Sequence, residues 1–87
     1  MINDEEMKRI AEYEEYRAKI DLFFPANEAE NKDMRLQLEE LFIMGFLQFQ
    51  ANSMILKHYK GDLNLVCQTL LDTEGDLERI INIVSSD

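Results

Sequence analysis

The sequence has very few residues of the kinds that build catalytic and metal centres. Cys67 is the only cysteine and His58 the only histidine among 87 residues. A lone cysteine excludes an intrachain disulfide. Zinc needs more ligands at short spacing, and a Cys–His nucleophile needs a third group to orient it. No phosphate-loop, dinucleotide or calcium-loop pattern occurs. We therefore expect no enzyme activity, no catalytic residue, no metal site and no cofactor.

Positive charge and long apolar runs are also scarce. Nine Lys and Arg stand against 18 Asp and Glu, which gives a formal net charge of −9. Such a balance disfavours nucleic acid and anionic membrane surfaces, which bind through Lys and Arg, and it favours a partner with a basic surface. No run approaches the roughly 20 apolar residues of a membrane span. No signal-peptide pattern follows Met1, so we expect a cytoplasmic or nuclear protein.

Glycine and proline interrupt the sequence only four times, with three glycines and one proline. No alternating strand pattern is present, so we predict an all-α fold. The longest predicted helix covers residues 2–24, with Asn3 as its N-cap and an end forced by Pro25. Its apolar stripe comprises Met7, Ile10, Tyr13, Ile20 and either Phe23 or Phe24. Residues 25–33 are predicted to be a polar linker, with Asn31 or Asp33 capping the next helix.

The remaining helices are predicted over residues 34–44, 51–59, 63–72 and 77–84, with a loop or frayed turn at 47–50. Gly45, Gly61 and Gly75 provide left-handed stops between them. Asp62 and Asp76 follow two of these glycines as N-caps, so the same stop-and-cap pair is used twice. The predicted organisation is an N-terminal amphipathic helix at 1–24, a linker at 25–33, a bundle at 34–72 and a C-terminal helix at 73–87.

Residues 42–47 are an apolar run with Gly45 in its middle, where the chain must reverse direction. Met44 and Phe46 are consequently held close together. The residue pattern alone leaves two interpretations open: the two side chains staple neighbouring helices in the core, or they face a partner.

Three short motifs occur in a fixed order: Met44-Gly45-Phe46, then Gly61-Asp62, then Leu70-Leu71. Together with core leucines at 38 and 41, this set resembles a ubiquitin-associated (UBA) domain. The resemblance covers residues 34–72 and implies a compact three-helix bundle. The long spacing between Gly45 and Gly61, with Asn52 and Lys57-His58, is similar to UBA domains of selective-autophagy cargo receptors. Val66 stands where the family often has alanine, which implies slightly wider packing.

The resemblance also implies a function. Ubiquitin presents an apolar patch ringed by basic residues, and Met44, Gly45, Phe46, Gln68 and Leu71 would contact it, whereas Leu70 would be core. The expected function is a non-catalytic module that binds ubiquitin or polyubiquitin weakly, as an adaptor in protein turnover or autophagy.

Two other functions stay open. In the first, the bundle and its flanking helices bind a helical partner or self-associate as an assembly protein, without ubiquitin. In the second, the chain resembles the UBA-like domains of nascent-chain or translation factors, which the acidic charge makes less favourable. Because a bundle of about 40 residues has a marginal core, we expect residues 2–24 and 77–84 to pack onto it or onto a second copy. The last helix would then be able to cover Leu71.

Overall fold

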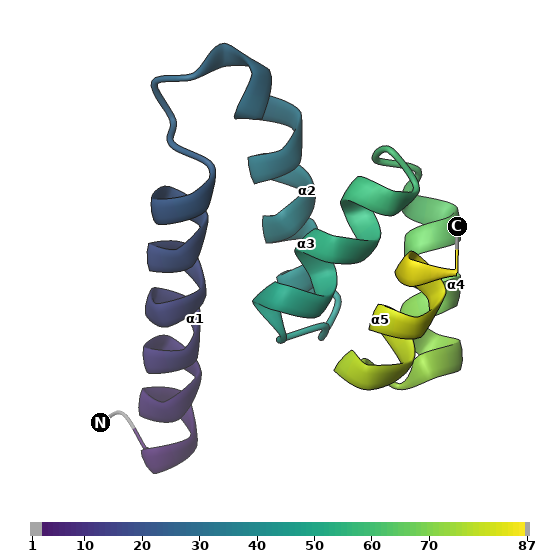
Figure 1. The fold of residues 1–87 in the computed structure, drawn as a ribbon. Coiled ribbons are helices and arrows are strands. Elements are labelled where there is room, and N and C mark those ends of the chain that lie inside the picture. Colours follow the sequence, from purple (N-terminus) through teal and green to yellow (C-terminus); the bar gives the residue numbers. More distant parts are fainter. Residues whose placement is uncertain (1–2, 87) are drawn as a thin grey trace.

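The fold is all-α, as the sequence predicts. A computed structural model describes residues 3–86, and within that range the chain forms helices and turns without a strand. The elements are α1 (Asp4–Phe23), the 3-10 turn η1 (Ala29–Asn31), α2 (Lys32–Ile43), α3 (Phe49–His58), α4 (Leu63–Thr73) and α5 (Leu77–Ser85). Figure 1 shows α1 and α2 side by side, joined by the linker, with α3 central and α4 and α5 beyond it. No helix in residues 3–86 is both long enough and apolar enough to span a membrane.

Most predicted helix ends are confirmed. The Asn3 carboxamide accepts a hydrogen bond from the Glu6 backbone N–H at 2.8 Å, so α1 has its predicted cap. Asp62 caps α4, and Asp76 caps α5 by accepting from two backbone N–H groups of its first turn. These ends were predictable because each depends on a short polar side chain and the few residues that follow it.

Two segments differ from the prediction. The linker is shorter than residues 25–33, because η1 begins at Ala29 and α2 already begins at Lys32. Asn31 occupies the N-cap position of α2 without making a side-chain cap bond. Its amide instead donates to the Pro25 carbonyl oxygen at 3.1 Å, which closes the linker on itself.

The predicted loop at 47–50 is also partly wrong. Helix α3 begins at Phe49, two residues before the expected start, and the Phe49 ring is buried. Gln48 stands at the N-cap position without a side-chain cap bond, so the sequence gives no local signal for this start.

The stripe predicted for α1 is correct only in its second half. Ile20 and Phe24 are buried together with Tyr16, which the predicted stripe omitted. Met7 and Ile10 are 59% and 48% exposed, so the prediction that they pack is wrong. Figure 1 shows the reason: the first turns of α1 extend past the end of α2 and have no neighbouring helix.

Both flanking helices contribute to one core, as expected from the marginal size of a three-helix bundle. Helix α1 packs against α2 and α3, and α5 packs against α3 through the fully buried Ile80. The other fully or nearly fully buried apolar residues of α2, α3 and α4 are Leu38, Leu41, Ala51, Ile55, Leu56, Val66 and Leu70. Since α5 lies against α3, Leu71 stays 67% exposed and is not covered.

Candidate functional site

The apolar run at residues 42–47 forms a tight helix-terminating turn. The Gly45 N–H donates to the Phe42 carbonyl at 3.0 Å, and the Phe46 N–H donates to the Leu41 carbonyl at 2.9 Å. These two bonds satisfy the last carbonyls of α2 and require a left-handed residue between them. Gly45 supplies it, with φ of +104°. A Cβ added at Gly45 would meet no atom within 4 Å, so the glycine is needed for its backbone angle and not for space.

The sequence singled out five residues for a binding face: Met44, Gly45, Phe46, Gln68 and Leu71. Four of them are exposed, whereas the Phe46 side chain is half-buried against the core. Leu70 is 1% exposed although its neighbour Leu71 is 67% exposed. Consecutive residues of α4 therefore point to opposite environments, as helical geometry requires of neighbours about 100° apart.

A cleft of about 280 Å³ brings part of this set together. Its walls include Gly45 and Phe46 from the turn, and Leu70 and Leu71 from the end of α4. Met44 does not line the cleft but reaches α4 separately, where the Cys67 thiol lies 3.6 Å from the Met44 sulfur. Gln68 is exposed on α4 and does not line the cleft either. The turn and α4 thus form one continuous surface, hereafter the turn–α4 face.

The turn is fixed from below by a buried polar side chain. Asn52 of α3 is 1% exposed, and its amide donates to the Phe46 carbonyl at 2.8 Å and to the Tyr16 hydroxyl at 3.0 Å. The Tyr16 hydroxyl in turn donates to the Leu38 carbonyl at 2.6 Å. These bonds connect α1, α2, α3 and the turn. Among the described residues, the Asn52 carboxamide oxygen is the one buried side-chain nitrogen or oxygen atom without a hydrogen-bond partner.

Burial makes Tyr16 resist ionisation. Removal from water raises the pKa of the Tyr16 hydroxyl to about 12, with a smaller rise from the negative charge of Glu39 and an opposing effect of the Asn52 hydrogen bond. Desolvation dominates because a phenolate loses more hydration than a phenol when it enters a low-dielectric core. Tyr16 is therefore a neutral hydrogen-bonding link at physiological pH and not a proton donor to a ligand.

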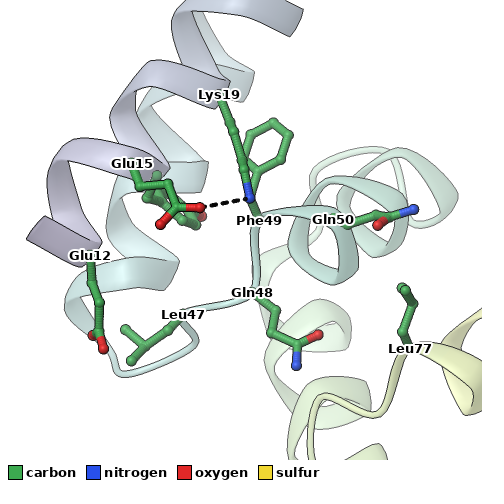
Figure 2. Close-up of a pocket in the computed structure, with 9 residues that line it drawn as sticks. Glu12, Glu15, Lys19, Leu47, Gln48, Phe49, Gln50 and Leu77 are labelled. Carbon is green, nitrogen blue, oxygen red and sulfur yellow. Dashed lines mark ion pairs between the residues drawn. The ribbon is translucent and has the colours of Figure 1, made fainter.

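A second groove adjoins the turn on the side of α1. Figure 2 shows Leu47 and Gln48 between Glu12 of α1 and Leu77 at the start of α5. The volume of this second groove is about 390 Å³. Leu47 and Gln48 line both this groove and the cleft of the turn–α4 face. The α1 wall of this second groove carries Glu12, Glu15 and Lys19, and Lys19 pairs with Glu15 at 3.7 Å, so the net charge that borders the apolar surface of the turn is acidic.

Two features of the site were not predicted from sequence. Tyr16 and Asn52 hold the turn, yet neither was predicted to be part of the site. Asn52 stands beside the polar residues Gln50 and Ser53, so the local pattern did not mark it as buried, and it entered the sequence analysis only through the family resemblance. Within residues 3–86 no group of three or more His, Cys, Asp or Glu side chains is placed to hold a metal ion.

No family model matches the chain, and the searches of curated proteins and of solved structures find no match either. The geometry and charge of the chain's own residues are therefore the observations that bear on function. Chief among them are an exposed, glycine-dependent turn, an exposed leucine on the neighbouring helix and an acidic border.

Proposed function

We propose that the chain is a non-catalytic, intracellular ubiquitin-binding module in which α2, α3 and α4 form a UBA-like bundle and the turn–α4 face receives ubiquitin. The observation that carries the proposal is the contrast at the end of α4. Leu70 is buried and Leu71 is exposed beside the Met44-Gly45-Phe46 turn, which is the division of roles that the family resemblance implies.

The chemistry of the turn suits a small apolar patch. Met44 is 53% exposed and carries a flexible, polarizable thioether that adapts to uneven apolar surfaces. Gly45 lets a partner's surface approach the backbone closely, because no side chain stands above it. Leu71 adds a branched aliphatic side chain at the other edge of the cleft. Together these residues offer apolar contact area without a deep pocket.

Charge supports the same partner. The chain carries a formal charge of −9, and Glu12 and Glu15 border the turn in the adjoining groove. Ubiquitin surrounds its apolar patch with basic residues, so opposite charges would meet at the rim of the contact. Rim charges of this kind mainly speed association and orient the partner, and they add little to affinity.

The expected affinity is weak. A contact limited to one turn and the end of one helix lies at the low end of interface areas, so we expect a Kd on the order of tens to hundreds of micromolar. Useful binding would then depend on avidity toward polyubiquitin or on several copies in one assembly. An adaptor in protein turnover or autophagy would operate in this regime.

The test is a titration of isotope-labelled chain with ubiquitin, followed by NMR. We expect shifts at Met44, Gly45 and Leu71 that saturate. Leu71→Ala should weaken binding about five- to tenfold with little effect on unfolding, since the lost contact is worth on the order of 1 kcal/mol. An unchanged spectrum at these residues up to millimolar ubiquitin would refute the proposal.

One observation favours a second function. Met7 and Ile10 are exposed on the part of α1 that extends beyond α2, where an assembly protein would bind a helical partner or a second copy. Sedimentation velocity over a hundredfold concentration range tests the self-association version. A constant monomeric sedimentation coefficient, unchanged by Met7→Ser, would exclude it.

A further inference from the structure

A third groove lies between α1 and α3, on a different face of α3 from the turn–α4 face. It has a volume of about 400 Å³, within the range of sites that hold a ligand side chain or small molecule. Ser53 and Lys57 line it from α3, whereas Ala51 and Asn52 line the cleft of the turn–α4 face. The two sites therefore share no described lining residue. We call this groove between α1 and α3 the Phe–Lys groove.

The apolar part of the Phe–Lys groove consists of three phenylalanines. The rings of Phe23 and Phe49 are stacked, with centroids 5.7 Å apart and an interplanar angle of 25°. Phe24 lies 6.2 Å from Phe49 in a tilted arrangement. Phe49 and Phe24 are buried, but Phe23 is 61% exposed although it is an aromatic residue. An incoming aromatic side chain would cover the open side of Phe23 and continue the stack.

The charge of the Phe–Lys groove is opposite to that of the whole chain. Acidic residues outnumber basic residues two to one in the sequence, yet the groove's lining residues include Lys19 and Lys57 and no acidic residue. The Lys57 ammonium lies 5.1 Å from the centre of the Phe24 ring, which holds it over the groove. Figure 2 shows Lys19 beside Phe49.

Neither lysine is committed to a strong partner. Lys19 pairs with Glu15 at 3.7 Å, but both side chains are largely exposed and such pairs contribute little. The C-terminal carbonyls of α1, which would repel an anion, are partly neutralised because Arg35 donates to the Phe24 carbonyl at 2.7 Å. Both ammonium groups can therefore turn toward an anion at the groove.

We propose that the Phe–Lys groove binds an acidic peptide segment of another protein that carries one aromatic side chain. The aromatic ring stacks against Phe23 and Phe49, and the flanking carboxylates pair with Lys19 and Lys57. The occupant is an acidic segment of another protein because the charged residues that line this groove are Lys19 and Lys57; a second copy of this chain is the competing occupant that the test distinguishes. This site is independent of ubiquitin binding and would let the chain hold two partners at once.

The test uses a peptide with one tryptophan flanked by two aspartates on each side, and a control peptide with lysines in place of the aspartates. Because the chain has no tryptophan, fluorescence excited where tryptophan absorbs and tyrosine does not comes from the peptide alone. We expect a blue shift and saturation with the acidic peptide only, together with NMR shifts at Phe23, Ser53 and Lys57. Raising the salt concentration should weaken the binding.

Charge variants provide the matched controls. Lys19→Gln and Lys57→Gln should each weaken acidic-peptide binding about two- to fivefold, the effect of one partly exposed ion pair. Lys8→Gln changes the same charge on the exposed first half of α1 and should have no effect. Leu71→Ala should also have none, which separates this site from the ubiquitin proposal.

Three results would overturn the proposal. The first is equal binding of the two peptides, because the lysines would then have no role. The second is a set of NMR shifts confined to the turn–α4 face. The third is a concentration-dependent shift at Phe23 and Ser53 without peptide, which would identify a second copy as the occupant.

Discussion

Tyr16→Phe removes a single oxygen atom from the centre of the hydrogen-bond network below the turn. The hydroxyl donates to the Leu38 carbonyl and accepts from the Asn52 amide. The ring itself would stay in place, because its contacts with Phe42 and Phe49 do not involve the oxygen. The substitution therefore isolates the hydrogen bonds from the packing.

The expected cost follows from those two bonds. A typical intramolecular hydrogen bond contributes about 1 kcal/mol, and a buried donor left without a partner costs more. The Asn52 amide keeps its bond to the Phe46 carbonyl but loses its second acceptor, while its oxygen already lacks a partner. We expect the free energy of unfolding to fall by about 2 kcal/mol at pH 7 and the Tm by roughly 10 °C. Urea unfolding followed by circular dichroism measures the first quantity.

The pH dependence gives a sharper test. Burial raises the pKa of Tyr16 to about 12 in the folded chain, against 10.0 for a free tyrosine. The folded state thus holds this proton more tightly, so the contribution is complete below pH 10 and is lost as the pH rises from 10 to 12. The loss amounts to at most about 2 to 3 kcal/mol. Tyr16→Phe lacks this titration, so its stability should converge on that of the wild type above pH 10.

Tyr13→Phe is the matched control. Tyr13 is also on α1 and also contacts Phe42, but it is 39% exposed and its hydroxyl lies 3.4 Å from a Glu39 oxygen. Its loss should change the free energy of unfolding by less than about 0.5 kcal/mol. If Tyr16→Phe and Tyr13→Phe cost the same, or if the stability gap at Tyr16 stays constant to pH 12, the network does not act as described.

Three further predictions concern single residues, and thermal unfolding measures the change in stability in each case. Gly45→Ala should lower stability by about 1 to 2 kcal/mol and weaken ubiquitin binding, because alanine resists a φ of +104°. Ile80→Ala should cost about 2 to 5 kcal/mol, whereas Ile81→Ala, at a 41% exposed site, should cost less than about 1 kcal/mol; equal costs would contradict the packing of α5 on α3. Asp76→Ala should lower the free energy of unfolding by about 1 kcal/mol, because α5 loses its N-cap. Asp76→Asn should keep most of the wild-type stability, because asparagine is also a good N-cap.

Helix boundaries were predictable where a local signal fixes them. Asn3, Asp62 and Asp76 cap their helices through side chains that bond to the following few residues. The start of α3 has no such signal, because Phe49 begins the helix through burial of its ring among α1 residues distant in sequence. The sequence between 47 and 50 therefore looked like a loop.

The face of α1 that packs was not predictable from the apolar pattern. Met7 and Ile10 have the right spacing for a buried stripe, but periodicity does not tell how far the neighbouring helices extend. The site itself stays a prediction as a set of residues: Met44 and Leu71 are exposed, whereas Phe46 is half-buried. The support of the turn by Tyr16 and Asn52 depends on contacts across three helices and left no motif in the sequence.

The repeated stop-and-cap pair bears on whether Leu71 has a role beyond packing. Carrying the offset between Gly61 and Gly75 along the two helices pairs Val66 with Ile80. Both side chains are fully buried, and α4 and α5 both pack on α3. The repeated glycine–aspartate pair therefore places a buried β-branched residue at the same position of each helix, which accounts for the packing of both helices on α3.

The same offset pairs Leu71 with Ser85, and here the two helices differ. Both positions are exposed, so neither side chain is required by the core. Serine at 85 is what solvent exposure favours, whereas leucine at 71 leaves apolar area in water beside the cleft of the turn–α4 face. A single exposed leucine is ordinary on its own, but one that breaks a repeat next to a glycine-dependent apolar turn supports the proposed contact surface. Leu71→Ser tests this directly: it should leave the Tm within about 2 °C of the wild type and reduce ubiquitin binding, and a large loss of stability would assign Leu71 to the core instead.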